Sequence, residues 1–355
     1  MPAGRSRRAH CLPDENHDET QLLAGTSLAT LGSVVMTAPE HNQDNEKHSS
    51  VESNGSGSPV SLVALDLAPA LSSRDIHRLL DAVGGSPESA ADTLLGLDAR
   101  SLGARLELSS SQAEVLARSF SSGVRMVGEE EHARLDEGID LVSFGDSRYP
   151  RSLAVIPDPP LLLRCLGNPA SAAVGIAIVG SRKPSDYGIR MTPRFVRACS
   201  DVGISVVSGG ARGIDGIAHR SAVLDGVPTL AVLANGLSIP YPPEHRPLFQ
   251  AIIQAGGALV SETPVRTPPR PWLFPRRNRI ISGMSLGVIV IEAAARSGAT
   301  ITARLAVEDH GRDALAVPGR IGDRLSEGCL RMLAEGWAGI ARSPQEAVAD
   351  LRRSL

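Results

Sequence analysis

Two segments in the second half of the chain combine glycine with serine and arginine directly after a short apolar run. The first holds Gly180, Ser181 and Arg182, and the second consists of Ser208, Gly209, Gly210, Ala211, Arg212 and Gly213. Glycine lets backbone N–H groups approach a phosphate without a Cβ in the way, and arginine adds charge-assisted hydrogen bonds. These residue types suit the binding of an anion. Taken singly, each segment is equally explained as a tight turn between a strand and a helix, which also needs glycine.

The segment from Thr263 to Arg279 carries five arginines and no acidic residue, with Trp272 and Phe274 between them. Such a segment suits single-stranded nucleic acid, because arginines follow the phosphates and each stacked base contributes about 1–3 kcal/mol. The two rings could equally anchor a long loop on the core. Five prolines predict that the segment is extended.

Few titratable residues could take part in catalysis, and each of them also has a simpler structural explanation. His219 lies in a helical stretch and is more simply a packed histidine than a general base. Asp215 suits a helix cap better than a ligand contact. Glu262 and Glu292 each follow an apolar run, so they could form an acid/base pair or fix the arginines of a binding pocket. No lysine-containing phosphate loop and no metal spacing of histidine or cysteine occurs, so we expect neither a metal nor a cofactor.

Charge is distributed unevenly, although the formal net charge of the whole chain is only -3. Residues 1–175 carry 14 basic and 24 acidic side chains, whereas residues 176–290 carry 13 basic and 6 acidic ones. The remaining residues are neutral in sum. A basic centre indicates an anionic partner, and it coincides with the glycine and arginine segments.

From residue 139 onward, apolar and mostly β-branched runs alternate with amphipathic helical stretches. Such runs predict a parallel sheet covered on both faces. The predicted fold class is therefore α/β, with an extended Rossmann-like, doubly wound, mostly parallel sheet that binds ligands at the carboxyl ends of its strands. Pro193, in the first helical stretch, predicts that this helix starts late or kinks. The expected strands are Ile176–Val179, Ile204–Val207, Thr229–Leu233, Leu259–Val260, Val288–Ile291 and Ala314–Val317.

The sequence divides into four parts by composition and periodicity. Residues 1–58 are expected to be disordered or a mis-called N-terminal extension. Residues 60–128 predict a small helical, SAM-like domain, which precedes a Rossmann-like domain at 139–340 and a helical tail at 341–355. We expect no membrane segment, because the one mildly apolar stretch, Leu22–Ala38, is short and interrupted by polar residues.

An ordered set of motifs resembles the DprA/Smf family of DNA-processing proteins over roughly residues 139–335. The set comprises Gly180-Ser181-Arg182, Ser208–Asp215, Tyr241-Pro242, Ser261-Glu262, Arg277-Asn278-Arg279, Ser297–Ala303 and Val317-Pro318-Gly319. The resemblance implies a non-enzymatic, cytoplasmic homodimer that binds single-stranded DNA through the Rossmann-like domain. It also implies that the protein protects incoming DNA and loads a RecA-type recombinase onto it in natural transformation and recombination. It places the DNA contacts at the two glycine and arginine segments and at Arg277, Asn278, Arg279, Ser297, Gly298 and Thr300.

The chain departs from the family pattern where Gly210 replaces a leucine and where Leu330 follows Cys329 in place of an asparagine. Little sequence follows Leu333, so we do not expect the winged-helix-like domain of some members. A different class of function stays open: a nucleotide-processing enzyme, similar to the phosphoribohydrolases on a related scaffold, with Glu292 as its acid. The G-G-x-G-T-x-x-E string of those enzymes does not occur in this sequence.

Overall fold

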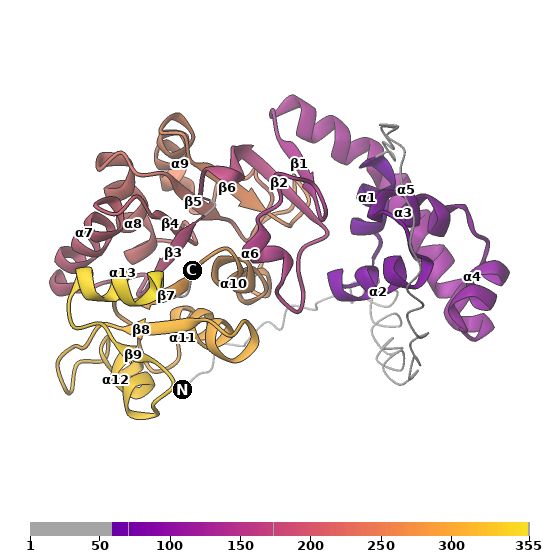
Figure 1. Ribbon diagram of the computed structural model, residues 1–355. Coiled ribbons are helices and arrows are strands. Elements are labelled where there is room, and N and C mark those ends of the chain that lie inside the picture. Colours follow the sequence, from indigo (N-terminus) through magenta and orange to yellow (C-terminus); the bar gives the residue numbers. More distant parts are fainter. Residues whose placement is uncertain (1–58, 70, 173, 354–355) are drawn as a thin grey trace, which may run out of the picture.

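The computed structural model describes residues 59–69, 71–172 and 174–353. The predictions for residues 1–58 therefore lie outside the described residues. A group of helices at the front of the chain packs against one end of an α/β body (Figure 1). None of the helices in the described ranges combines the length and the apolar character that crossing a bilayer requires.

The front of the chain forms helices α1 to α5, which share one apolar core. A serine or aspartate side chain caps the start of each of the helices α2 to α5, so the sequence itself marks where these helices begin. Helix α5 is the longest of the five, and Gly123 lets it lie directly against α1. A Cβ at Gly123 would meet the carbonyl oxygen of Ala64 at 2.0 Å. The bounds are α1 Pro59–Asp66, α2 Ser73–Val83, α3 Pro87–Gly96, α4 Ala99–Leu106 and α5 Ser110–Asp136.

The described strands form a single 9-stranded sheet in the order β1-β2-β6-β5-β4-β3-β7-β8-β9. Strands β1 and β2 run antiparallel to their neighbours, and every other pair is parallel. This order confirms the predicted α/β fold with a mostly parallel, doubly wound sheet. The bounds are β1 Asp140–Ser143, β2 Leu162–Gly167, β3 Gly175–Val179, β4 Ser205–Ser208, β5 Thr229–Val232, β6 Ala258–Ser261, β7 Gly287–Val290, β8 Asp313–Ala316 and β9 Gly339–Ile340.

Helices cover both faces of the sheet because alternate residues of each central strand point in opposite directions. In β3, Ile176 and Ile178 pack on one face with α7, α8 and α13, whereas Ala177 and Val179 pack on the other with α10, α11 and α12 (Figure 1). The first face also carries α9, and the second also carries α6. The bounds are α6 Arg151–Ala154, α7 Asp186–Ser200, α8 Ile214–Leu224, α9 Arg246–Gln254, α10 Leu273–Gly283, α11 Gly298–Arg304, α12 Glu327–Ala334 and α13 Pro344–Arg352.

Of the two alternatives that Pro193 left open, a late start of helix α7 is ruled out, and the prediction that the arginine-rich segment is extended is wrong. Helix α7 does not start late, because Ser185 caps it and the helix continues through Pro193. The segment Thr263–Arg279 is not extended throughout, because α10 begins at Leu273. Pro275 lies in the first turn of α10, where the missing N–H of proline would have no intrahelical partner in any case. The last three arginines of the segment therefore lie on a helix.

The end of the described chain is part of the body of the molecule. Val348 and Leu351 of α13 are buried in the same core as Ile176 and Ile178 of the central strand. We therefore propose that the Rossmann-like unit extends at least to Arg352 rather than ending before a separate tail at 341–355.

A buried arginine on β2 joins the front helices to the sheet. Arg164 on β2 donates to the carboxylate of Asp66 on α1 at 2.6 Å and to that of Glu130 on α5 at 2.7 Å. It also donates to the carbonyl oxygen of Glu262 at 2.9 Å. Glu130 in turn accepts from the backbone N–H of Val265 at 3.0 Å. The front helices thus hold the start of the arginine-rich segment that leads to α10.

Candidate nucleic-acid interface

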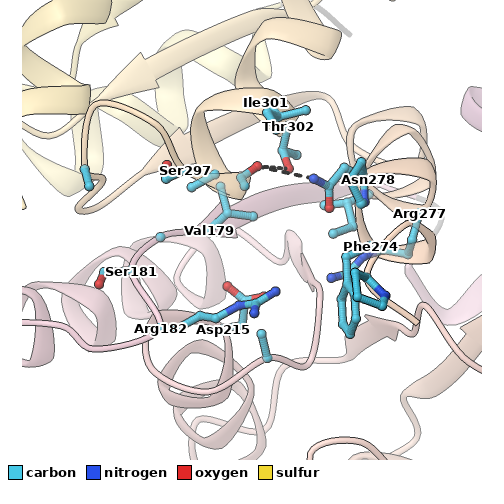
Figure 2. Close-up of a pocket in the computed structure, with 18 of the residues that line it drawn as sticks. Val179, Ser181, Arg182, Asp215, Phe274, Arg277, Asn278, Ser297, Ile301 and Thr302 are labelled. Atoms are coloured by element: carbon cyan, nitrogen blue, oxygen red, sulfur yellow. Dashed lines mark hydrogen bonds between the residues drawn. The ribbon is translucent and has the colours of Figure 1, made fainter. Parts of the chain in front are cut away.

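A pocket of about 700 Å³ opens at the carboxyl edge of the sheet, between the ends of β3 and β4 and the start of α11 (Figure 2). Helix α10 and the prolines before it form its opposite wall. Strand β3 pairs with β4 on one side and with β7 on the other, so the chain reverses its direction of winding here. Doubly wound sheets bind their ligands at this kind of position.

Four side chains near the pocket form a row in which cations flank aromatic rings. The guanidinium of Arg182 lies over the ring of Phe274, 5.2 Å from its centroid. Phe274 meets Tyr241 edge to face at 5.8 Å, and the guanidinium of Arg212 lies 5.9 Å from the centroid of Tyr241. Such a row offers both a charge for phosphate and a ring for a base.

The two arginines of the row differ in their partners. Arg212 donates to both carboxylate oxygens of Glu244, an exposed pair within the chain. Arg182 is exposed, and among the described residues no carboxylate lies within 4.0 Å of it. Arg182 is therefore available to an anion from outside the chain.

Arg277 supplies a positive charge from below the pocket. Its side chain is buried, and its Nη1 donates to the carbonyl oxygens of Gly209, at 2.5 Å, and of Val232. Burial lowers the pKa of Arg277 to about 10, against the opposing attraction of Asp215, so the group is still protonated near neutral pH. Its Nε has no hydrogen-bond partner among the described residues.

One backbone amide of the predicted phosphate cradles already has a carboxylate of the chain as its partner, and a second such contact lies just after the first cradle, at Ser185. Gly209 donates its N–H to Asp215 at 3.1 Å, and Ser185 donates its N–H to Glu292 at 2.9 Å and its hydroxyl to the same carboxylate. Burial raises the pKa of Asp215, although Arg277 opposes the shift. Asp215 is not the helix cap, since Gly213 holds that position. Glu292 is 4% exposed, and its carboxylate accepts both hydrogen bonds from Ser185 at the start of α7.

The structure brings most of the predicted site residues together around this pocket. Its lining includes Gly180, Ser181, Arg182, Ala211, Arg277, Asn278, Ser297 and Gly298. Asn278 is held there because its Nδ2 donates to the carbonyl oxygen of Gly298 at 3.3 Å (Figure 2). Gly209 and Arg212 line a smaller recess beside it, which shares Arg182 and Phe274 with the pocket.

Other residues that were predicted to contact DNA have structural roles. Ser208 is fully buried and donates to the carbonyl oxygen of Ile178 at 2.7 Å. Gly210 and Gly213 have φ of 65° and 77°, the left-handed region that glycine adopts without strain. Thr300 takes part in the capping box of α11.

Arg279 belongs to a buried ion-pair network and does not line the pocket. It makes a two-pronged contact with Glu262, at 3.0 and 2.7 Å, and donates to Asp158 at 3.0 Å. Glu262 also pairs with Arg276 at 3.2 Å. Glu262 thus fixes two arginines, as one of the two roles left open by the sequence requires, but neither arginine lines the pocket.

His219 is a packed residue, as the sequence indicated. Its ring is fully buried, and its Nδ1 lies 2.8 Å from the hydroxyl of Thr229. Burial lowers the pKa of His219 to about 3, so the ring is neutral at physiological pH. Trp272 does not anchor a loop, because it is 59% exposed.

Sequence reasoning missed the role of Tyr241 in the row of rings and cations. Tyr241 was noted only as part of a motif with Pro242. The available signal was its position after β5, whose carboxyl end lies at the same edge of the sheet as those of β3 and β4. The structure adds Pro269 and Pro271 to the lining as well.

The fold and the pocket define a Rossmann-type protein with a cationic site at its carboxyl edge. Residues 140–352 match the family described as DNA recombination-mediator protein A. The chain belongs to this family, and the resemblance to the DprA/Smf proteins is thereby confirmed.

Curated relatives and solved structures agree with this assignment. Protein Smf of Escherichia coli is 43% identical over 216 residues, which are 61% of this chain and 57% of that protein. The DNA processing protein DprA of Bacillus subtilis is 37% identical over 203 residues, which are 57% of this chain and 68% of that protein. The chain thus spans little more than half the length of the first of these relatives.

Two solved structures have the same fold. The DNA processing protein A of Streptococcus pneumoniae superposes with a TM-score of 0.60 and 31% identity, over 79% of this chain and 98% of that one. The protein of the same name from Helicobacter pylori superposes with a TM-score of 0.55 and 28% identity, over 61% of this chain and 96% of that one. The second structure was described for the single-stranded DNA binding mode of the Helicobacter protein.

Proposed function

We propose that this protein binds single-stranded DNA in the pocket at the carboxyl edge of its sheet. The observation that carries the proposal is Arg182, exposed and without a carboxylate partner among the described residues, which lies over the ring of Phe274 beside that pocket. Membership of the recombination-mediator family and the Helicobacter structure support DNA as the anion.

Each pocket residue has a role in this proposal. Arg182 and the neighbouring exposed Lys183 bind phosphates, and Phe274 offers its ring to a base. Arg277 adds attraction from below, where burial limits screening by salt. Asn278 and the backbone of Gly180, Ser181, Ala211, Ser297 and Gly298 shape the surface that the strand lies on. The network of Arg279, Glu262 and Asp158 positions α10 and does not touch DNA.

Membership of the family also suggests a role for the protein in the cell. We propose that the protein acts in the cytoplasm as a homodimer, protects incoming single-stranded DNA and loads a RecA-type recombinase onto it during natural transformation. The proposal includes no catalytic step, cofactor or metal. The chemistry is reversible binding, so the strand can be handed on intact.

Titration of fluorescently labelled oligo-dT at several salt concentrations tests DNA binding. We expect tight binding. The logarithm of the association constant should fall linearly with the logarithm of the salt concentration, with a slope of about -0.7 for each phosphate contacted. Arg182→Ala should weaken binding about tenfold or more, because a hydrogen bond to a charged group contributes about 1.5–3 kcal/mol. Arg220→Ala is the matched control, since it removes an exposed arginine of α8 that does not line the pocket.

Two results would count against the proposal. Equal binding by Arg182→Ala and the control would mean that the pocket is misplaced. Absence of oligonucleotide binding, together with release of base from a nucleoside monophosphate, would favour the nucleotide-processing enzyme.

A further inference from the structure

A second pocket, of about 540 Å³, lies against the start of α11. It shares Ser297, Gly298 and Ile301 with the first pocket, so the two are separated only by the start of this helix. We call this start of α11 the ridge between the pockets. Gly298 has no side chain, and a Cβ added there would point into open space, with Asn278 at 3.9 Å as its nearest neighbour, so the ridge is low at this residue.

The second pocket repeats the main feature of the first. The guanidinium of Arg304 lies over the ring of Trp337, 5.2 Å from its centroid, which is the same distance as between Arg182 and Phe274. Each pair puts a cation and an aromatic ring on one pocket. The two pairs lie on opposite sides of the shared ridge.

The lining of the second pocket is positively charged. It holds Arg296, Arg304 and Arg331, against a single carboxylate, that of Glu335. Arg331 pairs with Glu335 at 2.7 Å, and Arg304 lies 3.8 Å from it. Arg296 is exposed, and in the described part of the chain no carboxylate lies within 4.0 Å of it.

We propose that the second pocket holds the continuation of the same DNA strand, a proposal that rests on the proposed function. The strand leaves the first pocket, crosses the ridge at Gly298, and places its next phosphates at Arg296 and Arg331. A base packs on the accessible part of the Trp337 ring, which also contacts Arg304, packs partly against the core and donates its N–H to Glu335 at 2.9 Å. Phosphate takes the place of Glu335, which gives up its exposed pair with Arg331 and the exposed hydrogen bond from Trp337, and an exposed ion pair contributes little to stability.

The geometry fits a path more than one nucleotide long. Along α11, the rise from Gly298 to Arg304 is about 9 Å at 1.5 Å per residue. An oligonucleotide that fills the first pocket alone therefore does not reach the second. Recognition there is indifferent to base sequence, because stacking needs only the flat face of a base.

Oligonucleotide length and tryptophan fluorescence test the proposal in the full chain. The chain has two tryptophans, so Trp272→Phe leaves Trp337 as the reporter. We expect an oligo-dT of about fifteen nucleotides to quench Trp337, and one of two nucleotides, which spans less than the distance of about 9 Å along α11, to bind without quenching it. Arg296→Ala should weaken binding of the long oligonucleotide about fivefold and leave the short one unchanged. Arg220→Ala serves again as the control for loss of an exposed arginine.

The outcomes separate the two proposals. If both oligonucleotides bind, but Arg296→Ala has no effect and Trp337 is not quenched by the long one, the second pocket is not on the path and only this proposal fails. Equal weakening of the binding of both oligonucleotides would mean that Arg296 acts by long-range electrostatic attraction and not by contact with the strand, which would also refute the proposed path. Quenching of Trp337 by protein concentration alone would assign the pocket to a second copy of the chain. If neither oligonucleotide binds the wild type, the proposed function fails and takes this inference with it.

Discussion

Replacing Arg279 separates a structural arginine from a DNA-binding one. The sequence places Arg279 among the DNA contacts, whereas the structure pairs it with Glu262 and Asp158. Its side chain is 9% exposed and that of Glu262 is 7% exposed. Burial lowers the pKa of Arg279, but the two carboxylates raise it more, so the net shift is upward and the pair stays charged.

Arg279→Ala leaves Glu262 buried with only Arg276 beside it. Breaking a buried pair by removing one partner costs about 3–5 kcal/mol. For a domain of this size, each kcal/mol lowers Tm by about 2–4 °C, so we expect a fall of about 6–20 °C. Arg279→Lys keeps the charge but loses the two-pronged contact, and its Tm should fall in between.

Thermal unfolding followed by circular dichroism measures the effect, and oligo-dT titration well below Tm measures binding of the folded variant. Arg320→Ala is a matched control, because this arginine is exposed. We expect the control to keep both Tm and affinity. A variant Arg279→Ala that keeps its Tm but loses oligonucleotide binding would refute this reasoning and restore Arg279 as a DNA contact.

Two further predictions concern the fold. His219 has a folded pKa of about 3, below its unfolded value, so its contribution to stability is present above about pH 6.5 and is lost as pH falls toward 3. His219→Gln should therefore reduce the acid-side slope of the free energy of unfolding by up to about 1.4 kcal/mol per pH unit, and an unchanged slope in urea titrations would contradict the assignment. In α5, Gly123→Ala forces a Cβ against the backbone of Ala64 and should destabilise the protein by about 1–3 kcal/mol. Gly128→Ala meets nothing within 4 Å in the same helix and should stabilise it by about 0.5–1 kcal/mol; equal effects of the two substitutions in a denaturant series would refute the close packing of α1 and α5.

The central strands were predictable because each is a continuous apolar run. The sheet buries both faces of such a strand, so every position is apolar and the strand can be recognised without knowing which strands lie beside it. The two edge strands β1 and β9, and β2 beside β1, were not predicted. Strand β9 has only two residues, both exposed, and β2 carries the buried Arg164, whose charge is acceptable only because Asp66 and Glu130 meet it.

The position of the pocket was also predictable, because the carboxyl ends of parallel strands meet at one edge of the sheet. The sequence did not show which amides near the glycine segments already have a partner. Gly209 of the second segment donates to Asp215, 6 positions away, and Ser185, which follows the first segment, donates to Glu292, 107 positions away. Local sequence shows that an amide can bind an anion but not whether a distant carboxylate has already filled the place.

The sequence by itself determined the class of fold, the edge of the sheet at which the pocket opens and the positive charge of the central segment. These properties follow from periodicity and composition, which are local. Only the tertiary structure decided which arginines are free to bind. Arg182 and Arg279 look alike in the sequence, but Arg279 meets Asp158 from 121 positions away and Arg182 meets an aromatic ring. An ion pair depends on the distance between two side chains, and that distance is set by packing rather than by sequence separation.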